Sequence, residues 1–397
     1  MRHPATLPTG TAQISPVPQS YNVGIVSAAS SRRAFLLSST ALLACGRRKA
    51  TRYPGYCFIA NHDAHSIALV DLSTFRYLRA IRVDAAPSAV LPHPRLARVF
   101  ALAHTPATVY EIDTATLAVS RQTRAGAQAA GMLLAGGEVL WLLCREPAAL
   151  VEIPLDSLRP RRRIPLADPP DDFDVSGQRA AVVSRSSGTV VFANLEHAAV
   201  LRSVPVTRDS SIVRFQQKGA QVIAGSPADK SVSMLDAATG NLLVRLPLPV
   251  EPRHFCFSAD EGQIFISGPG RDAVVIVYPY QTEIGETILA GRAPAAMSVV
   301  AANGANYLLV TNPETNSVTA LDVDTRRLAA VVNVGREPRH ILVTPDRQYA
   351  LVLNEGSGDL AVIRIASLAA RRYKSAPLFT LIPVGEKPVD AAVITFA

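Results

Sequence analysis

Residues 294–335 read PAAMSVVAANGANYLLVTNPETNSVTALDVDTRRLAAVVNVG. Four short apolar runs, MSVV, YLLVT, SVTALD and AAVVNV, alternate with segments rich in Gly, Asn, Asp and Pro, the residue types that reverse a chain. Runs this short are typical of strands and too short for helices. The stretch therefore predicts a four-stranded antiparallel meander.

This pattern repeats along the chain. The residue that ends the third strand recurs at intervals of 40 to 44 residues. Its successive positions are Asp71, Asp113, Pro154, Asn194, Asp236, Tyr278, Asp322 and Arg364. A repeat of this length with four strands per unit is typical of the blades of a β-propeller. The count predicts eight blades, with seven as the alternative if the weakly patterned third unit, residues 130–165, forms no full blade.

Two stretches near the C-terminus resemble a known repeat. The segments YLLVTNPETNSVTALDVDTRR, residues 307–327, and EPRHILVTPDRQYALVLN, residues 337–354, are similar to the YVTN-type β-propeller repeat of YncE-like and lactonase-like propellers. The resemblance implies an all-β fold, with a single propeller of four-stranded antiparallel blades over residues 56–397. It also implies that the last strand, residues 388–396, joins the first blade and closes the ring, which removes an open sheet edge.

The N-terminal region has a different character. Residues 1–30 contain no acidic residue and no periodic pattern, which predicts a disordered extension. Residues 31–45 contain Arg32 and Arg33 before a mostly apolar run, which resembles a twin-arginine export signal. The run ends at Cys45 in a sequence that resembles a lipobox, so we expect this cysteine to carry a lipid anchor; an ordinary cleaved signal is the alternative. Residues 46–55 would then form a basic tether.

Charge is concentrated in the same region. Seven Arg and Lys residues precede residue 53, where there is no Asp or Glu, and the whole chain has a net charge of +8. The propeller itself therefore carries about +1. This near-neutral charge of the propeller argues against nucleic-acid binding. The basic tether and the expected lipid on Cys45 make the membrane a predicted partner.

Two further features have ordinary structural interpretations. Cys57, Cys144 and Cys256 each lie inside an apolar strand, which predicts buried small side chains rather than a zinc knuckle or a haem attachment. The run RPRRR, residues 159–163, is interpreted as a solvated outer edge whose charge discourages sheet pairing.

The mouth of the central channel is the expected place for a site. In a propeller, the residues that begin the innermost strands surround this mouth. Four of the eight aligned positions are His or Asp, the other four are Ala or Ser, and the loop at residues 61–65 adds two histidines on the same face. Two arginines beside the aligned histidines make the mouth electropositive. The candidate ligand-binding residues are His62, His65, Asp172, Arg253, His254, Arg339, His340 and Asp390.

These residues leave several functions open. No catalytic residue or cofactor is predicted, because no complete acid/base or nucleophile set is visible. A divalent metal is possible, with His254, His340 and Asp390 as candidate ligands, while solvated histidines are the alternative. We predict an exported, lipid-anchored periplasmic or envelope protein. Its mouth would bind or scaffold a protein, a glycan or a small anionic ligand. The alternatives are a lactonase-like or metal-dependent hydrolase that uses the mouth His and Asp residues, and an accessory partner of a periplasmic redox protein.

Overall fold

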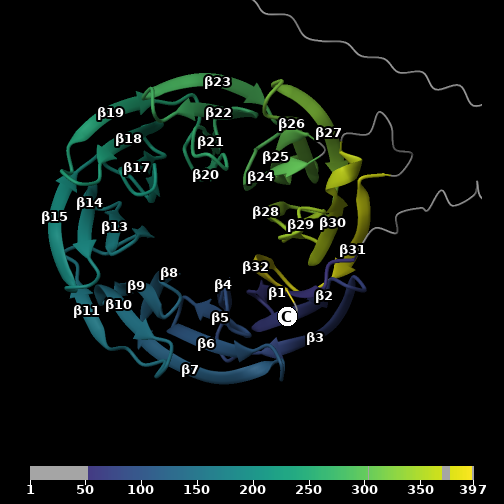
Figure 1. The fold of residues 1–397 in the computed structure, drawn as a ribbon, viewed down its shortest axis with the longest axis horizontal. Helices are drawn as coiled ribbons and strands as arrows, with labels where there is room; N and C mark the ends of the chain where they lie inside the picture. The colour runs from purple at the N-terminus through teal and green to yellow at the C-terminus, as the bar shows by residue number, and fades with distance from the viewer. Residues whose placement is uncertain (1–51, 303, 369–375, 396–397) are drawn as a thin grey trace, which may run out of the picture. The chain divides into compact units, whose positions relative to one another are not determined.

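A computed structural model describes residues 52–302, 304–368 and 376–395 of the chain. The described part contains eight four-stranded antiparallel sheets, arranged in a ring as the blades of a propeller around a central axis (Figure 1). The predictions of an all-β fold and of eight blades are confirmed, and the weakly patterned third unit does form a blade. The predicted disordered extension, the export signal at Arg32 and Arg33, and the lipidation site at Cys45 lie outside the described residues.

The strands are grouped by blade as follows. Blade 1 contains β1 (Gly55–Asn61), β2 (Ser66–Asp71), β3 (Arg76–Arg82) and β32 (Pro388–Thr395). Blade 2 contains β4 (Pro87–Pro92), β5 (Arg98–Ala103), β6 (Ala107–Asp113) and β7 (Ala118–Gly126). Blade 3 contains β8 (Gln128–Ala135), β9 (Val139–Glu146), β10 (Ala148–Pro154) and β11 (Arg162–Pro165). Blade 4 contains β12 (Asp172–Ser176), β13 (Arg179–Ser184), β14 (Thr189–Asn194) and β15 (Ala199–Pro205).

The second half of the ring continues in the same order. Blade 5 contains β16 (Ile212–Gln216), β17 (Gln221–Ser226), β18 (Ser231–Asp236) and β19 (Leu242–Pro247). Blade 6 contains β20 (His254–Phe257), β21 (Ile264–Ser267), β22 (Ala273–Tyr278) and β23 (Glu283–Leu289). Blade 7 contains β24 (Met297–Ala302), β25 (Ala305–Asn312), β26 (Ser317–Asp322) and β27 (Arg327–Asn333). Blade 8 contains β28 (Pro338–Val343), β29 (Tyr349–Asn354), β30 (Asp359–Arg364) and β31 (Leu378–Pro383).

In the part of the chain that the structure describes, helical structure is confined to two short turns. These are the 3-10 helices η1 (Pro313–Thr315) and η2 (Ile365–Ser367). Within the described ranges, no helix has the length and apolar character needed to cross a bilayer.

The ring closes through the C-terminal strand. β32 is the innermost strand of blade 1 and pairs antiparallel with β1, from Gly55 opposite Thr395 to Asn61 opposite Pro388. The Tyr53 hydroxyl also bonds the Thr395 hydroxyl. The predicted closure is therefore confirmed, and β1 has no free edge.

The core lies in the seams between neighbouring blades. The second and third strands of each blade are apolar on both faces, because each face packs against an adjacent blade; β5 and β6 are buried at all but one position each. Cys57 and Cys144 are fully buried as predicted, whereas Cys256 is partly exposed. Trp141, the chain's single tryptophan, is 3% exposed on β9.

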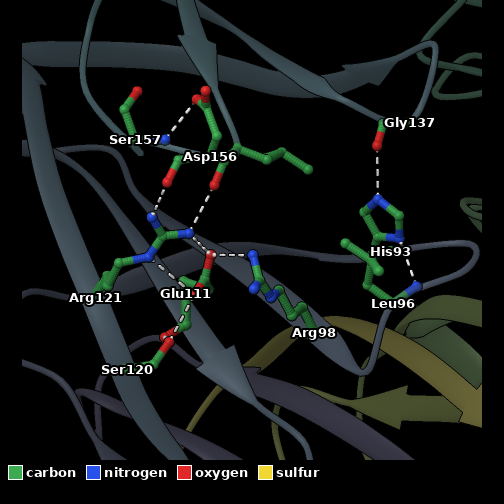
Figure 2. Close-up of polar contacts among 10 residues, drawn as sticks. His93, Leu96, Arg98, Glu111, Ser120, Arg121, Gly137, Asp156 and Ser157 are labelled. Atoms are coloured by element: carbon green, nitrogen blue, oxygen red, sulfur yellow. Dashed lines mark hydrogen bonds and ion pairs between the residues drawn. The ribbon is translucent and has the colours of Figure 1, made fainter.

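A recurring arginine on the outer strands ties successive blades together. In blade 2, the Arg121 guanidinium bonds the buried Glu111 carboxylate beside it and donates to the backbone carbonyls of Leu155 and Asp156 in blade 3, at 2.7 Å each (Figure 2). A second link between the same blades joins His93 Nε2 to the Gly137 carbonyl at 2.7 Å.

The arrangement repeats with the period of the blades. Arg79, Arg162 and Arg202, on the outer strands of blades 1, 3 and 4, each donate to a carbonyl in the last turn of the next blade. Arg162 also bonds the Glu152 carboxylate, and Arg163 donates to the Ala125 carbonyl at 2.7 Å. Residues 159–163 are partly or fully exposed, as interpreted, but Arg162 and Arg163 also bond groups of neighbouring strands and blades. Sequence alone gave no means to see that a buried carboxylate and unpaired carbonyls lie within their reach.

Three buried asparagines explain the repeat signature on the mouth face. Asn61, Asn312 and Asn354 end the second strand of blades 1, 7 and 8 and are fully buried. The Asn61 amide donates to the Val384 carbonyl at 2.7 Å, in the loop that leads to the innermost strand. In that loop, a Cβ on Gly385 would lie 2.5 Å from the Asn61 amide nitrogen. A glycine is therefore required where this loop crosses the asparagine.

Candidate ligand site at the channel mouth

Loops from both ends of the blade pattern share the mouth face, as predicted. The His62 amide donates to the Lys387 carbonyl at 2.9 Å, which joins the β1–β2 loop to the loop before β32. In blade 8, the Glu355 amide donates to the Glu337 carbonyl at 3.0 Å in the same way. The mouth is therefore built from side chains on paired loops.

Two of the predicted binding residues instead bridge neighbouring blades. Asp390 Oδ2 accepts a hydrogen bond from the Val90 amide at 2.7 Å, which joins β32 to the innermost strand of blade 2. Asp172 Oδ2 accepts from the Val213 amide at 2.9 Å and from Arg214, which joins β12 to β16. Burial raises the pKa of both carboxyl groups, although these partners act in the opposite direction. In each carboxylate, Oδ2 is committed to the link between blades.

Asp174 makes a third bridge that sequence reasoning missed. Its Oδ2 accepts from the Phe215 amide at 2.8 Å, and burial raises its pKa. The signal was present in the spacing, because residues two apart on a strand point to the same side. Asp172 and Asp174 therefore contact the same neighbouring strand.

His340 faces the ring-closing strand. Its Nε2 lies 3.4 Å from Asp390 Oδ1, longer than a usual hydrogen bond, and the two side chains are 29% and 23% exposed. Among the predicted binding residues, His340 of blade 8 and Asp390 of blade 1 thus form a close imidazole–carboxylate contact between blades.

The two histidines of the β1–β2 loop do not join this pair. His62 Nδ1 bonds its neighbour Asp63 at 2.7 Å, and Lys387 Nζ lies 3.5 Å from the same carboxylate oxygen. His65 is exposed at the turn, with a backbone φ of 47°. The loop carries its own small charge cluster at the rim.

Three of the predicted residues do meet, in a pocket across blades 6, 7 and 8. Arg253, His254 and Arg339 line a cavity of about 590 Å³. The remaining lining residues are Gly268, Pro269, Gly270, Arg271, Asp272, Ala293, Pro294, Ala295, Pro313 and Glu314. Sequence reasoning missed Arg271, which directly follows the lining residues 268–270.

The pocket keeps its histidine uncharged. Burial, followed by the positive charges of Arg253 and Arg339, lowers the pKa of His254 to about 4. At neutral pH the imidazole is therefore a neutral hydrogen-bonding group beside guanidinium groups. An anion that enters would meet fixed positive charge together with a neutral donor.

The three guanidinium groups differ in how firmly they are held. Arg253 Nη2 bonds Glu251 Oε2 at 2.9 Å. Arg339 Nε lies 3.6 Å from Glu355 and 3.9 Å from Glu337, beyond hydrogen-bond distance. Glu355, also missed from sequence, is a partly buried carboxyl group. Burial raises its pKa, Arg339 and Lys387 oppose the shift, and Glu337 and Asp63 add to it.

The candidate metal ligands are not brought together. Among the residues that the structure describes, no group of three or more His, Cys, Asp or Glu side chains is placed to hold a metal ion. His254 lines the pocket, whereas His340 and Asp390 contact each other at the closing strand.

Comparisons with known proteins identify the fold. No family model matches the chain, and no curated protein matches its sequence. Among solved structures, the dihydro-heme d1 dehydrogenase NirN in complex with DHE aligns with a TM-score of 0.70 at 14% identity, over 85% of this chain and 74% of that chain. Hydrazine synthase of Kuenenia stuttgartiensis aligns with a TM-score of 0.52 at 19% identity, over 78% of this chain and 92% of that chain.

A third solved structure aligns over a similar share of the chain. It is a functionally unknown protein from Desulfotomaculum acetoxidans DSM 771, with a TM-score of 0.59 at 12% identity, over 86% of this chain and 99% of that chain. At these identities the likeness shows the propeller fold alone. The function has to be argued from the residues of the mouth.

Proposed function

We propose that this protein is a binding module whose channel mouth takes a small anionic ligand. The observation that carries the proposal is the pocket across blades 6 to 8, which is lined by Arg253, Arg271 and Arg339 together with the neutral His254. Of the expected partners, a protein, a glycan or a small anion, the small anion fits a cavity of about 590 Å³.

The charges of the pocket support a ligand of modest charge. The lining contains three arginines and two acidic residues, Asp272 and Glu314. Arg271 makes no ion pair with another described residue, so its planar fork of donors is free to bind a carboxylate or a phosphate.

Calorimetric titration of the full-length protein tests this function. The probes are acetate, hexanoate, citrate and inorganic phosphate, measured at low and at moderate salt. Arg271→Gln and Arg339→Gln should each weaken binding about tenfold, and salt should weaken it in the wild type. Arg245→Gln, on the exposed outer strand β19, removes the same charge away from the pocket and serves as the matched control. Failure of all four probes to bind, or an equal loss in the control, overturns the proposal.

The repeat family and the location are part of the same proposal. Similarity to the YVTN-type repeat is supported by the buried asparagines Asn312 and Asn354 at matching positions. Export by the twin-arginine route and anchoring through Cys45 are supported by the sequence alone. Mass spectrometry of the mature N-terminus should find a diacylated Cys45, and Cys45→Ser should move the protein from the membrane to the soluble fraction. An unmodified, uncleaved N-terminus would contradict both.

One observation favours a second function. His340 lies 3.4 Å from Asp390, whose pKa is raised by burial, and such a pair can move protons in hydrolysis. A lactonase-like activity would require His340→Gln to abolish turnover of a lactone while ligand binding in the pocket survives. Equal turnover by the variant and the wild type would exclude a catalytic role for this pair.

A further inference from the structure

We infer that the ligand is an organic acid whose carboxylate takes Arg339 away from Glu355, so that Glu355 is a specificity-determining residue of the site. The inference rests on the proposed function and adds the class of ligand and a competitor built into the protein. Arg339 lies between the pocket and the carboxylates of Glu355 and Glu337.

Arg339 belongs to the pocket and to an acidic patch at the same time. Its side chain lines the cavity next to His254, and its charge acts on that imidazole. On its other side, its Nε lies 3.6 Å from Glu355 Oε2 and 3.9 Å from Glu337 Oε2. The side chain is 51% exposed. A half-exposed guanidinium with only long contacts can turn toward a better acceptor at small cost.

Glu355 is the acidic partner that interacts more strongly with Arg339. Its side chain is 21% exposed, against 57% for Glu337. Because solvent screens it less, Glu355 interacts more strongly with Arg339 than Glu337 does. Its surroundings are otherwise mixed, with Lys387 as a second cation and with Glu337 and Asp63 as anions. An incoming carboxylate therefore competes with Glu355 for the same donor.

The apolar part of the lining selects an organic anion. Pro269, Pro294 and Pro313, together with Ala293 and Ala295, present apolar surface to the cavity. An inorganic anion would leave this surface in contact with water. A carboxylate with a chain of several carbons would bury it, which adds about 0.8 kcal/mol per buried methylene, or roughly fourfold in affinity.

Titration with hexanoate tests the competition directly. Glu355→Gln keeps the shape of the side chain and removes its charge, so hexanoate should bind this variant about three- to tenfold more tightly than the wild type. Glu337→Gln should give a smaller gain, because this carboxylate is farther away and more exposed. Glu386→Gln, an exposed carboxylate in the loop before β32, is the matched control for a general loss of negative charge and should change affinity less than twofold.

The outcomes separate this inference from the function on which it rests. Tighter binding by Glu355→Gln with the control unchanged supports the competition. Unchanged or weaker binding by a folded Glu355→Gln, while wild type still binds hexanoate and Arg339→Gln binds it more weakly, overturns the competition and leaves the anion site standing. Binding of phosphate in preference to hexanoate overturns the organic acid. If the wild type binds no probe, the proposed function itself fails.

Discussion

Glu152 is held by Arg161 and Arg162, and we expect that removing Arg162 destabilises the protein more than neutralising the Glu152 carboxylate does. Glu152 is 1% exposed and bonds Arg161 and Arg162, whose side chains are 58% and 40% exposed. Arg162 also donates to the Glu196 carbonyl at 2.8 Å and to the Leu195 carbonyl at 3.3 Å, both in blade 4. The buried partner of the pair is therefore the anion.

The magnitudes follow from which charge is left behind. Glu152→Gln leaves two guanidinium groups that water can solvate, so we expect a loss of about 1–2 kcal/mol in the free energy of unfolding. Arg162→Met leaves a buried carboxylate with Arg161 alone and breaks two links to the next blade, so we expect a loss of about 2–4 kcal/mol. Because the two residues share one interaction, the double variant should lose about 1–2 kcal/mol less than the sum.

Urea unfolding followed by tryptophan fluorescence measures these losses in the right place. Trp141 pairs with Glu152 across β9 and β10, so its signal reports on this blade. Burial opposes ionisation of Glu152, but the bonds and charges of Arg162 and Arg161 outweigh it and hold its pKa below the usual range. The stabilisation is therefore present at neutral pH and lost as the pH falls through this pKa, so the variant and the wild type should converge in acid. An equal or larger loss in Glu152→Gln than in Arg162→Met would refute this reasoning.

Three further predictions concern the mouth. Because burial raises the pKa of Asp390, its ionised form is disfavoured in the folded state, and stability should decline as the pH rises through this pKa. In thermal unfolding, Asp390→Asn should remove that decline. Asp390→Ala, which loses the hydrogen-bond acceptor, should cost about 1–3 kcal/mol of stability. Gly385→Ala should cost about 1–3 kcal/mol, because φ is +131° and the new Cβ would clash with Asn61, and a soluble variant of wild-type stability would contradict the close approach. By NMR, His254 should titrate near pH 4, and Arg339→Gln should raise that pKa; an unchanged value would mean that Arg339 does not face the imidazole.

The fold could be predicted because it is written in local patterns. Turn residues and short apolar runs repeat with the spacing of the blades, and this holds even in blade 3, where the signature of the repeat is lost. The arginines of the outer strands that bond the next blade repeat as well, at positions 79, 121, 162 and 202. Their role stayed hidden because it depends on carbonyl groups in the next blade, which the sequence does not place.

The site was predictable only in part, for the same reason. Alignment of the units found the positions that begin the innermost strands, and His254 with its neighbour Arg253 does line the pocket. The same alignment could not tell a side chain that faces the cavity from one that faces the seam. Asp172 and Asp390 occupy equivalent positions, yet Oδ2 of each accepts a hydrogen bond from a backbone amide of the adjoining blade.

The pairing of Gly55 with Thr395 sets the order of events during synthesis. The ribosome completes every other blade before it makes the strand that finishes the first one. Until then, the apolar strand GYCFIAN offers an open hydrogen-bonding edge to any neighbouring nascent chain. A premature stop that removed only β32 would leave this edge exposed for good, so such a product should be degraded or should aggregate even though 31 of the 32 described strands are intact.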